Sequence, residues 1–579
     1  MNHELAPRRR RDGRRSRKWL LLLLLFAIAA GVTIWWKLSH SANTSYVVPQ
    51  YTAQPNPIMI RGEWTEQYAR GSDEGMLIPM PIASRLLGDG VRYEEKTESI
   101  ILTNDTKVMH FKTGELDATL NRKPMTLRFA AKKFDDDLYL PIAPLTELFG
   151  IQIKLAESTG IVTLYEPGEE VRHGKVSLSK TKGITMREGP AKSYPIVEDL
   201  LAGTDVRILE EEEEGWYKIQ SASGHFGYAA KSGVAIGELE TIPSEKEDDK
   251  PFVAWKSEGQ KINLTWEAVY SANPDTAKIG ELPGVNVVSP TWFELVDGEG
   301  NVRSNANSSY VKWAHSKGIQ VWGLFSNGFE PDRTHNALSS YESRSVMIQQ
   351  MLAYAKTFKL QGVNIDFENV YTKDKDNLVQ FVREMTPLMH EQNLVVSIDV
   401  TAKSNSEMWS AFLDRKRLGA SVDFMMLMAY DEHWASSPVS GSVSSLPWTE
   451  NSVRRILEED GVPASKFILG VPLYTRIWTE EPNGEGGVKV SSKTMSMNAV
   501  NKLIEEKKLK PVFSAETGQN YVEFKEDKAL KRIWIEDAVS MKARAELVGK
   551  YDLGGVASWR RGFESQDIWD VLDKTLQNK

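Results

Sequence analysis

Residues 362–368 read Gly362-Val363-Asn364-Ile365-Asp366-Phe367-Glu368. Apolar and polar side chains alternate in this stretch, and successive side chains of a β-strand point to opposite faces. The apolar side chains are therefore predicted on one face, and the amide and the two carboxyl groups on the other. Carboxylates on a buried face cost desolvation free energy unless they are paired or used. Such a row at the carboxyl end of a strand suits the mouth of a parallel barrel, where active sites lie.

The segments on both sides of this strand have helical periodicity. Apolar side chains recur at helical spacing over residues 345–360 and again over residues 377–390. A helix, a short apolar strand and a second helix are typical of a parallel α/β sheet. A half-exposed edge strand would also explain the alternation, but it would not explain the two flanking helices.

Working outward, strand-like runs alternate with helical stretches through the whole C-terminal block. Eight such strands over residues 252–579 predict a (β/α)₈ TIM barrel. The spacing between the seventh and eighth strands is long, so residues 478–548 are predicted to be an insertion on the top face. The predicted strands are 261–266, 285–290, 319–325, 362–368, 394–400, 423–429, 467–473 and 553–559.

The N-terminus indicates attachment to a membrane. Residues 1–18 hold eight basic and two acidic groups, and residues 19–36 follow without a charge. As a helix this run spans roughly 27 Å, which predicts a single-pass transmembrane anchor with a cytoplasmic tail and an extracellular catalytic domain at the cell membrane. A cleaved signal peptide is the alternative, with a small-residue site at 27–29.

Charge and composition exclude several classes of function. The chain has 579 residues and a net charge of −8; because residues 1–18 contribute +6, residues 19–579 sum to −14. An acidic ectodomain is a poor nucleic-acid binder, so no nucleic-acid partner is expected. The absence of Cys excludes disulfides, thiolate metal sites and Cys nucleophiles. His433 has no partner at ligand spacing, so neither a metal site nor a cofactor is predicted.

Three further segments precede the barrel, which makes the chain multidomain. Residues 37–60 are predicted to be a linker, and residues 61–168 an α+β stalk domain. The stalk contains a repeat at an offset of 62 residues, in which 77–79, 84–88 and 100–102 correspond to 139–141, 146–150 and 162–164. Two such units are expected to pack as one module. Residues 172–235 carry short strands between turn residues and predict a small β-barrel, and residues 236–251 read as a charged linker.

The N-terminal segments resemble two known domain families. The repeat-containing residues 61–168 resemble the copper-amine-oxidase-like N-terminal stalk domain of bacterial cell-surface proteins. No His cluster there would bind copper, and a spacer role is the preferred interpretation. The glycines, aromatic residues and turns of residues 172–235 resemble a bacterial SH3-like domain. That resemblance implies either binding of a cell-wall peptide or a second spacer.

The barrel resembles glycoside hydrolase family 18, and within it the bacterial spore-cortex and cell-wall N-acetylglucosaminidases. The family motif is Asp-x-x-Asp-x-Asp-x-Glu. Aligned on Glu368, its acidic positions fall on Gln361, Asn364 and Asp366, so two acids are amides here. Because Asn364 cannot share a proton as an Asp would, we expect a shifted pH optimum without loss of activity. The resemblance rests on 289–293, 362–368, 428–433, 470–474 and 554–560.

This resemblance implies a role for each site residue. Glu368 would be the general acid and later the base, and Asp366 would orient the 2-acetamido group whose carbonyl attacks the anomeric carbon. Tyr430 would hydrogen-bond that carbonyl, and Trp559 would form the floor of the −1 sugar site. The further substrate-binding candidates are Asn364, Trp292 and Asp431. Core or rim packing is the interpretation for the remaining groups at strand ends, namely Trp266, Phe325, Asn327, Asp399 and Tyr474.

The residues themselves support part of this assignment. Asp366 and Glu368 lie two positions apart on one strand, so a charge on the first raises the pKa of the second and keeps it protonated for acid catalysis. The sequence thus predicts a membrane-anchored glycoside hydrolase that cleaves β-1,4 bonds of an N-acetylglucosamine-containing polysaccharide, either peptidoglycan or chitin. A non-catalytic glycan-binding cell-wall protein is the alternative, and a sporulation or wall-assembly scaffold is a third reading.

Overall fold

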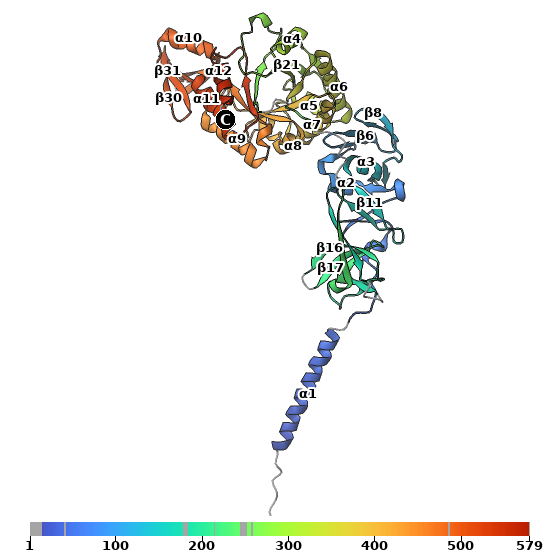
Figure 1. The fold of residues 1–579 in the computed structure, drawn as a ribbon. Helices are drawn as coiled ribbons and strands as arrows, with labels where there is room; N and C mark the ends of the chain where they lie inside the picture. The colour runs from blue at the N-terminus through green and yellow to red at the C-terminus, as the bar shows by residue number, and fades with distance from the viewer. Residues whose placement is uncertain are drawn as a thin grey trace, which may run out of the picture. The chain divides into compact units, whose positions relative to one another are not determined.

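The computed structural model describes residues 14–39, 42–177, 183–212, 215–243, 252–255, 259–483 and 487–577 (Figure 1). The chain divides into two compact units. Residues 1–88 and 128–248 make the first unit, and residues 89–127 and 249–579 make the second. Most of the predicted cytoplasmic tail (1–13) and the end of the predicted linker (244–251) lie outside the described residues.

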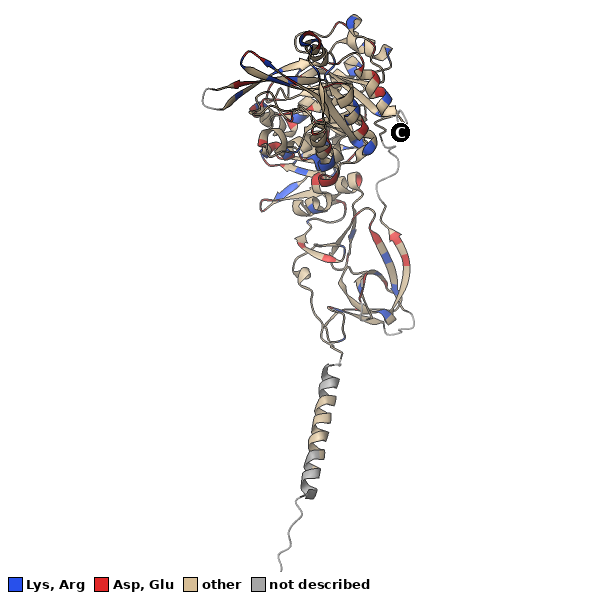
Figure 2. Cartoon of the chain, turned by 90° about the vertical axis from the view of Figure 1, so that its left-hand side faces the viewer, with Lys and Arg blue, Asp and Glu red and all other residues tan. Residues whose placement is uncertain are grey.

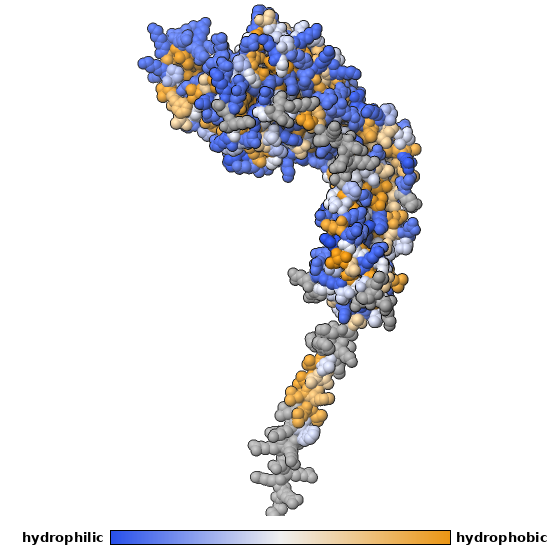
Figure 3. All heavy atoms as spheres, viewed as in Figure 1, coloured by the Kyte–Doolittle hydropathy of each residue, from blue (hydrophilic) through white to orange (hydrophobic). Residues whose placement is uncertain are grey.

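The segment predicted as an anchor forms helix α1 (Arg14–Ser39). Leu24 and Phe26 are exposed on this helix, and Figure 3 shows orange, hydrophobic residues along its middle part. In the part of the chain that the structure describes, no helix is both long enough and apolar enough to cross a membrane. The anchor over residues 19–36 is not supported by this criterion and stays a prediction.

The repeat of the stalk is visible in the structure. Two short helices, α2 (Met80–Leu87) and α3 (Ile142–Phe149), occupy corresponding positions, and each is followed by a glycine with positive φ. The corresponding strands β3 (Leu77–Pro79) and β10 (Asp137–Pro141) pair with each other antiparallel, and β9 (Lys132–Phe134) completes their sheet. A second sheet has the order β11-β12-β1-β2 and contains β1 (Pro57–Ile60), β2 (Glu63–Tyr68), β11 (Gln152–Leu155) and β12 (Val162–Tyr165).

The two predicted linkers contain regular structure. The end of the first, residues 57–60, is strand β1, whose apolar residues are buried. The start of the second belongs to β19 (Val234–Thr241), which pairs antiparallel with β13 (Glu170–Val176). These strands form a seven-stranded sheet in the order β15-β14-β18-β17-β16-β13-β19. Its other members are β14 (Ile184–Arg187), β15 (Ile196–Leu200), β16 (Asp205–Glu212), β17 (Trp216–Ser221) and β18 (Phe226–Ala230).

One part of the stalk departs from the prediction of a single α+β module. Residues 89–127 form a five-stranded antiparallel sheet that belongs to the compact unit of the barrel. Ile101 and Val108 join the barrel's apolar core, and Glu94 forms an ion pair with Arg344 at 2.6 Å. No pattern within the stalk sequence predicts these contacts. The strands are β4 (Val91–Glu94), β5 (Ser99–Thr103), β6 (Val108–Lys112), β7 (Asp117–Leu120) and β8 (Lys123–Thr126).

The C-terminal block is the predicted barrel. All eight predicted strands are present and pair in parallel, and the pairing of the first two closes the barrel. A short strand, β22 (Val302–Ser304), pairs antiparallel with the carboxyl end of β21. The barrel strands are β20 (Ile262–Glu267), β21 (Val287–Leu295), β23 (Gln320–Ser326), β24 (Gly362–Asp366), β25 (Val395–Thr401), β26 (Phe424–Met428), β27 (Phe467–Pro472) and β33 (Gly555–Trp559).

Helices follow the strands from β21 onward and form an outer layer (Figure 1). Acidic and basic residues are interspersed along the chain of this unit (Figure 2). Between β20 and β21 the structure has only a 3₁₀ turn (Thr276–Lys278), although the sequence pattern predicts alternation throughout. The helices are α4 (Ser308–Ser316), α5 (Pro331–Leu338), α6 (Tyr341–Phe358), α7 (Lys375–His390), α8 (Arg415–Ser421), α9 (Leu446–Glu459), α11 (Ala538–Lys550) and α12 (Ile568–Gln577).

The predicted insertion between the seventh and eighth strands has different bounds in the structure. It begins earlier, with β28 (Tyr474–Pro482), and ends at β32 (Ala529–Ile535). The predicted range ran to residue 548 because it included α11, which is the barrel helix before β33. The insertion is a five-stranded sheet with one helix, α10 (Met497–Lys507), and its other strands are β29 (Val488–Ser496), β30 (Val512–Ser514) and β31 (Gln519–Glu526).

Two apolar layers confirm which way the side chains of β24 point. Val363, Ile365 and Phe367 pack in one cluster with apolar residues of α7, so they face the helices. Residues that alternate with such positions on neighbouring strands, for example Trp322 and Leu324, form a separate cluster inside the barrel. By the same alternation, Asn364 and the two acids point into the barrel.

Candidate active site

A cavity of about 1330 Å³ opens at the carboxyl ends of the barrel strands. It is formed by the loops that follow the strands, together with residues of β28 from the insertion. Asp399 and Trp266 also line it, although the sequence pattern alone assigned them to packing. Six of the seven predicted site residues lie along its wall: Glu368, Asp366, Tyr430, Asp431, Trp292 and Trp559.

The backbone of Glu368 is fixed by the side chain of Asn327. The Glu368 N–H donates to Asn327 Oδ1 at 3.1 Å, and Asn327 Nδ2 donates to the Glu368 carbonyl oxygen at 2.7 Å. Asn327 is fully buried, and its Nδ2 also donates to Thr334 Oγ1 at 2.9 Å. This amide on the loop after β23 therefore sets the position of an acid on the loop after β24.

Asp366 and Glu368 carry raised pKa values because the surrounding protein keeps their carboxyl groups from bulk water: Asp366 is buried and Glu368 is half-buried. Burial raises the pKa of Asp366 to about 7. Burial raises the pKa of Glu368 well above its usual range, and the nearby charges of Asp366 and Asp431 add to the shift. Asp366 Oδ1 is buried and has no hydrogen-bond partner among the residues that the structure describes. Glu368 is thus held in its protonated form, ready to donate a proton.

Asn364 lies beneath the cavity rather than on its wall. Its Oδ1 accepts hydrogen bonds from Trp266 Nε1 at 2.8 Å and from Ser289 Oγ at 3.2 Å. Its Nδ2 donates to Asp399 Oδ1 at 2.9 Å. Because Asn364 is fully buried and its amide is engaged on both sides, the predicted contact with substrate is replaced by a connecting role between strands.

Asp431 is anchored by two residues of the insertion. Its Oδ1 accepts a hydrogen bond from Tyr474 Oη at 2.6 Å and forms an ion pair with Arg476 at 2.8 Å. The ring of Tyr474 meets that of Tyr430 edge-on at a centroid distance of 6.2 Å. Burial, reinforced by the charge of Asp399, raises the pKa of Tyr430 well above 10, so its hydroxyl stays protonated and can donate a hydrogen bond.

The two predicted tryptophans occupy different environments. Trp559 is half-buried at the end of β33, next to Trp266 at a centroid distance of 6.0 Å. Trp292 is 1% exposed, packs against Tyr310 and donates its Nε1–H to Asn273 Oδ1 at 2.7 Å. The structure therefore places Trp292 almost fully buried within the cavity wall and leaves Trp559 partly accessible.

Further aromatic side chains surround the cavity and are strongly exposed. They come from loops after four different strands, and none was singled out by the sequence pattern, because surface aromatics on loops carry no periodic signal. Exposed aromatic side chains at a cavity rim favour sugar stacking, since the faces of pyranose rings are apolar. They are Tyr270, Phe329, Trp409 and Trp434.

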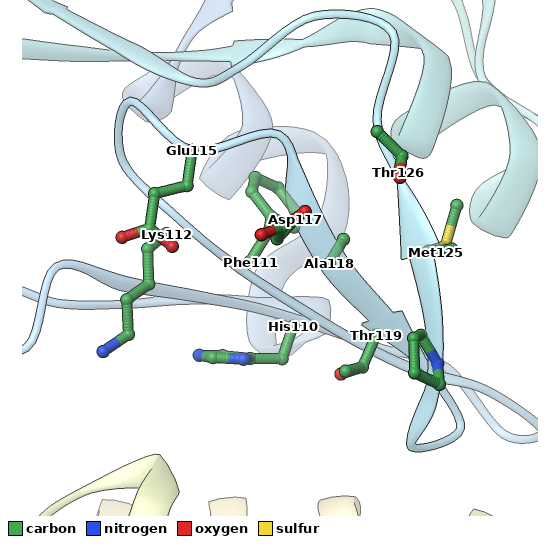
Figure 4. A pocket seen from close by; sticks show the side chains of 10 residues that line it. His110, Phe111, Lys112, Glu115, Asp117, Ala118, Thr119, Met125 and Thr126 are labelled. Atoms are coloured by element: carbon green, nitrogen blue, oxygen red, sulfur yellow. The ribbon is translucent and has the colours of Figure 1, made fainter.

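A second cavity, of about 520 Å³, lies on the β4–β8 sheet of the same unit (Figure 4). His110 and Lys112 on β6 line it, but both are engaged elsewhere. The ring of His110 stacks on Tyr341 and bonds Ser99 Oγ at 3.0 Å, and Lys112 forms an ion pair with Glu342. Burial lowers the pKa of His110 to about 4. Through these contacts the β4–β8 sheet packs against the first residues of α6 in the same unit.

Across the residues that the structure describes, no group of three or more His, Cys, Asp or Glu side chains has an arrangement that could hold a metal ion. His433, considered above as a ligand, bonds the Ser442 carbonyl oxygen through Nδ1 at 2.8 Å.

Comparison with known families identifies the barrel. Residues 301–564 match the model of glycosyl hydrolases family 18. Residues 182–235 match the bacterial SH3 domain, and residues 65–164 match the copper amine oxidase N-terminal domain. Each match lies within the segment for which the same resemblance was predicted, and the barrel is a family 18 glycosyl hydrolase domain.

Individual relatives agree with this assignment. The chain is 25% identical over 341 residues to an uncharacterized glycosylase, YvbX, of Bacillus subtilis, covering 56% of this chain and 94% of that protein. It is 30% identical to the putative sporulation-specific glycosylase YdhD and 24% identical to the cortical fragment-lytic enzyme, both of Bacillus subtilis. The matches cover 42% and 44% of this chain, and the chain spans only 56% and 58% of the length of these two relatives.

Among solved structures, the chitinase of Chromobacterium violaceum is 22% identical, with a TM-score of 0.49. The match covers 55% of this chain and all of that one. The spore cortex-lytic enzyme SleL of Bacillus megaterium is 18% identical, with a TM-score of 0.48 and coverage of 59% and 77%.

Proposed function

We propose, from the family 18 domain and the geometry of its cavity, that this glycosidase cleaves β-1,4 bonds of an N-acetylglucosamine-containing polysaccharide with retention of configuration. One observation carries the proposal. The carboxyl groups of buried Asp366 and half-buried Glu368 lie two residues apart at the barrel mouth, and burial raises the pKa of both. A site of this kind holds one proton for donation and one negative charge for stabilisation.

The first step uses the proton of Glu368. Glu368 donates it to the glycosidic oxygen as the bond to the anomeric carbon breaks. The carbonyl oxygen of the substrate's own 2-acetamido group forms the new bond to that carbon, giving an oxazolinium ion. This substrate-assisted route needs no enzyme nucleophile. Water then attacks the same carbon while the Glu368 carboxylate takes up a proton, which restores both the acid and the acetamide.

Asp366 and Tyr430 act on the acetamide group. The ionised Asp366 accepts a hydrogen bond from the acetamide N–H and stabilises the positive charge of the oxazolinium ring. Its Oδ1, which lacks a partner in the structure, is available for this contact. The protonated hydroxyl of Tyr430 donates to the acetamide oxygen, and Trp559 supports the face of the sugar.

The cavity and the N-terminal domains favour a long polymer. Its volume and its four exposed rim aromatics exceed what a single sugar needs. Peptidoglycan is preferred over chitin because the chain also carries a bacterial SH3 domain, which we propose binds a cell-wall peptide, and because a cortical fragment-lytic enzyme is among the relatives.

The cellular location is proposed from the sequence. The basic residues of 1–18 and the uncharged run of 19–36 favour attachment to the cytoplasmic membrane with the barrel outside. Membrane fractionation of the full chain and of a variant lacking residues 1–41 tests this. Equal amounts of both proteins in the soluble fraction would contradict it.

Product analysis tests the activity. Purified wall glycan and chitin oligomers are incubated with the wild type and with Glu368→Gln, and the products are identified by mass spectrometry. We expect shortened N-acetylglucosamine-containing fragments from the wild type only. If the two proteins bind glycan equally and neither cleaves it, the barrel is a glycan-binding module and the enzymatic proposal fails.

A further inference from the structure

Asp399 is a buried acid at the reaction site, and the mechanism above assigns it no role. It lies on β25 and is 3% exposed. Ile365 of β24 pairs with Ile398 of β25, so Asp366 and Asp399 each follow one residue later on neighbouring parallel strands. Neighbouring strands are about 4.8 Å apart. Both side chains point into the barrel, so the two carboxyl groups are neighbours.

The hydrogen bonds of Asn364 tie Asp399 to the catalytic strand. The indole N–H of Trp266 can only donate, so the Asn364 atom that it meets is the amide oxygen. The Asn364 NH₂ group therefore faces Asp399, to which it donates at 2.9 Å. Asp399 therefore lies next to Asn364. Asn364 is the position of β24 at which the family motif has an Asp and this chain has an amide.

Packing does not explain a carboxyl group at this position. The inner layers of such barrels are usually filled by branched apolar side chains, and a buried carboxyl with only a neutral donor costs free energy. Lys403, on the loop after β25, does not neutralise it, because its Nζ is bound to Asp460 and Glu459. The other titratable groups around Asp399 are acidic: Asp366, Glu368 and the hydroxyl of Tyr430.

We propose that Asp399 is a positioning residue of the glycosidase reaction, which acts on Asp366 and Glu368 through its charge and through the Asn364 amide. It supplies from the next strand the acidic neighbour that Asn364 does not provide. The inference rests on the proposed function for its catalytic consequence. Its electrostatic part concerns the folded protein alone and can be measured without turnover.

The direction of the effect follows from charge. Burial, together with the charges of Asp366 and Glu368, raises the pKa of Asp399 well above its usual range, against a lowering by the Asn364 hydrogen bond. A negative charge on any member of the trio raises the pKa of the other two. Removing Asp399 therefore lowers the pKa values of Asp366 and Glu368, and the pH range of activity moves to lower pH.

The first experiment compares the pH dependence of kcat/KM for the wild type, Asp399→Asn, Asp399→Glu and the control Asp423→Asn. Asp423 is also a largely buried acid beside β25, but it precedes β26 and bonds His390 and the Val396 N–H. We expect both limbs of the Asp399→Asn profile to move down by about one pH unit, with a peak value within about tenfold of the wild type. Asp399→Glu should restore the profile, and Asp423→Asn should leave it in place.

The second experiment measures Tm against pH for Asp399→Asn, Asp366→Asn and the double variant. We expect Asp399→Asn to raise Tm more at high pH than at low pH, because it removes a charge that the folded state must bury. The gain should be smaller when Asp366 is already neutral. Unshifted pH profiles together with additive Tm changes would overturn the proposal. An inactive wild type whose Tm changes are still coupled would overturn the proposed function and leave the coupling established.

Discussion

Two clusters of carboxyl groups in the catalytic unit, one in the helical shell and one at the barrel mouth, have opposite surroundings. In the helical shell, Arg344 is fully buried between Glu384 at 2.7 Å and Glu94 at 2.6 Å. At the barrel mouth, Asp366 and Asp399 are also buried, and Glu368 is half-buried. Yet among the residues that the structure describes, no Arg or Lys forms an ion pair with any of these three. In the shell, the carboxyl groups form ion pairs with a guanidinium group. At the mouth, raised pKa values favour the protonated, neutral form of the carboxyl groups.

The pKa values follow this difference. In the shell, the charges and hydrogen bonds of Glu384 and Glu94 outweigh burial and raise the pKa of Arg344 above its already high value. At the mouth, burial and mutual repulsion raise the pKa values of the acids. A shell acid thus lies beside a permanent cation, whereas a mouth acid can gain or lose a proton during a reaction. The comparison predicts that substitutions at the mouth reduce the rate and substitutions in the shell reduce stability.

The largest effect is expected from Glu368→Gln, which removes the donated proton but keeps the shape of the side chain. We expect kcat to fall about 10²- to 10⁴-fold, with Tm unchanged or raised, in assays with an aryl β-glycoside of N-acetylglucosamine. Glu330→Gln, an exposed carboxyl on the preceding loop, is the control and should keep the wild-type rate. A large loss of Tm in Glu368→Gln would show that this acid stabilises the fold, against the comparison.

Asp366→Asn should have the next largest effect. The variant keeps the hydrogen-bonding shape but loses the charge that stabilises the oxazolinium ring, so kcat should fall about 10²- to 10³-fold. KM should change little if the acetamide is bound mainly by Tyr430 and Trp559. A near-normal kcat would remove Asp366 from the mechanism and leave the barrel mouth with a single functional acid.

Arg344→Met should show the opposite pattern. It leaves Glu384 and Glu94 buried without their cation, which is expected to cost about 3–5 kcal/mol in the free energy of unfolding. Urea titration measures this loss, and kcat of the protein that remains folded should match the wild type. Because Glu94 lies on β4, deletion of residues 89–127 should destabilise the barrel as well. A fully stable Arg344→Met protein would show that the shell cluster is not needed for stability.

The pH dependence separates the two regions without any substitution. The folded pKa of Asp366, about 7, lies above its unfolded value. The stability from its protonation is therefore present at low pH and is lost as the pH rises through 7. Tm of the wild type should fall relative to Asp366→Asn between pH 5 and pH 8, and kcat/KM should rise near pH 7 as Asp366 ionises. Curves of Tm that stay parallel would contradict the raised pKa.

Asn364→Asp is expected to have the smallest effect. It adds a fourth acid beside Asp399, which should raise the pKa values of the others and move the pH profile upward by less than about one unit. Peak activity should remain within about threefold of the wild type, as measured by kcat/KM across pH 4–9. Loss of all activity would mean that the hydrogen bond donated by Asn364 to Asp399 requires an amide at this position.

Patterns of local periodicity were sufficient to predict the barrel strands and the inward direction of Asp366 and Glu368. They did not separate α11 from the insertion, because a helical pattern alone does not show whether a helix belongs to the barrel or to an insertion. They also did not assign residues 89–127 to the barrel unit, because that depends on ion pairs such as Arg344 with Glu94, about 250 positions apart.

Single residues at strand ends were harder to interpret from the sequence. Trp292 was predicted at the substrate, and the structure places it in the cavity wall with its ring almost fully buried against Tyr310. Asn327 and Asp399 were assigned to packing, since their partners Glu368 and Asn364 lie on neighbouring strands or loops that only the closed barrel brings together.

The most direct test of the account is the anomeric configuration of the first product. Proton NMR, recorded in the first minutes of hydrolysis of a chitin oligomer or wall glycan, distinguishes the two anomers before they interconvert. If the substrate's acetamide attacks and Glu368 supplies the proton, the β-anomer appears first and Glu368→Gln gives no signal. Initial formation of the α-anomer would mean that water attacks directly, and the assigned roles of Asp366 and the acetamide group would be wrong.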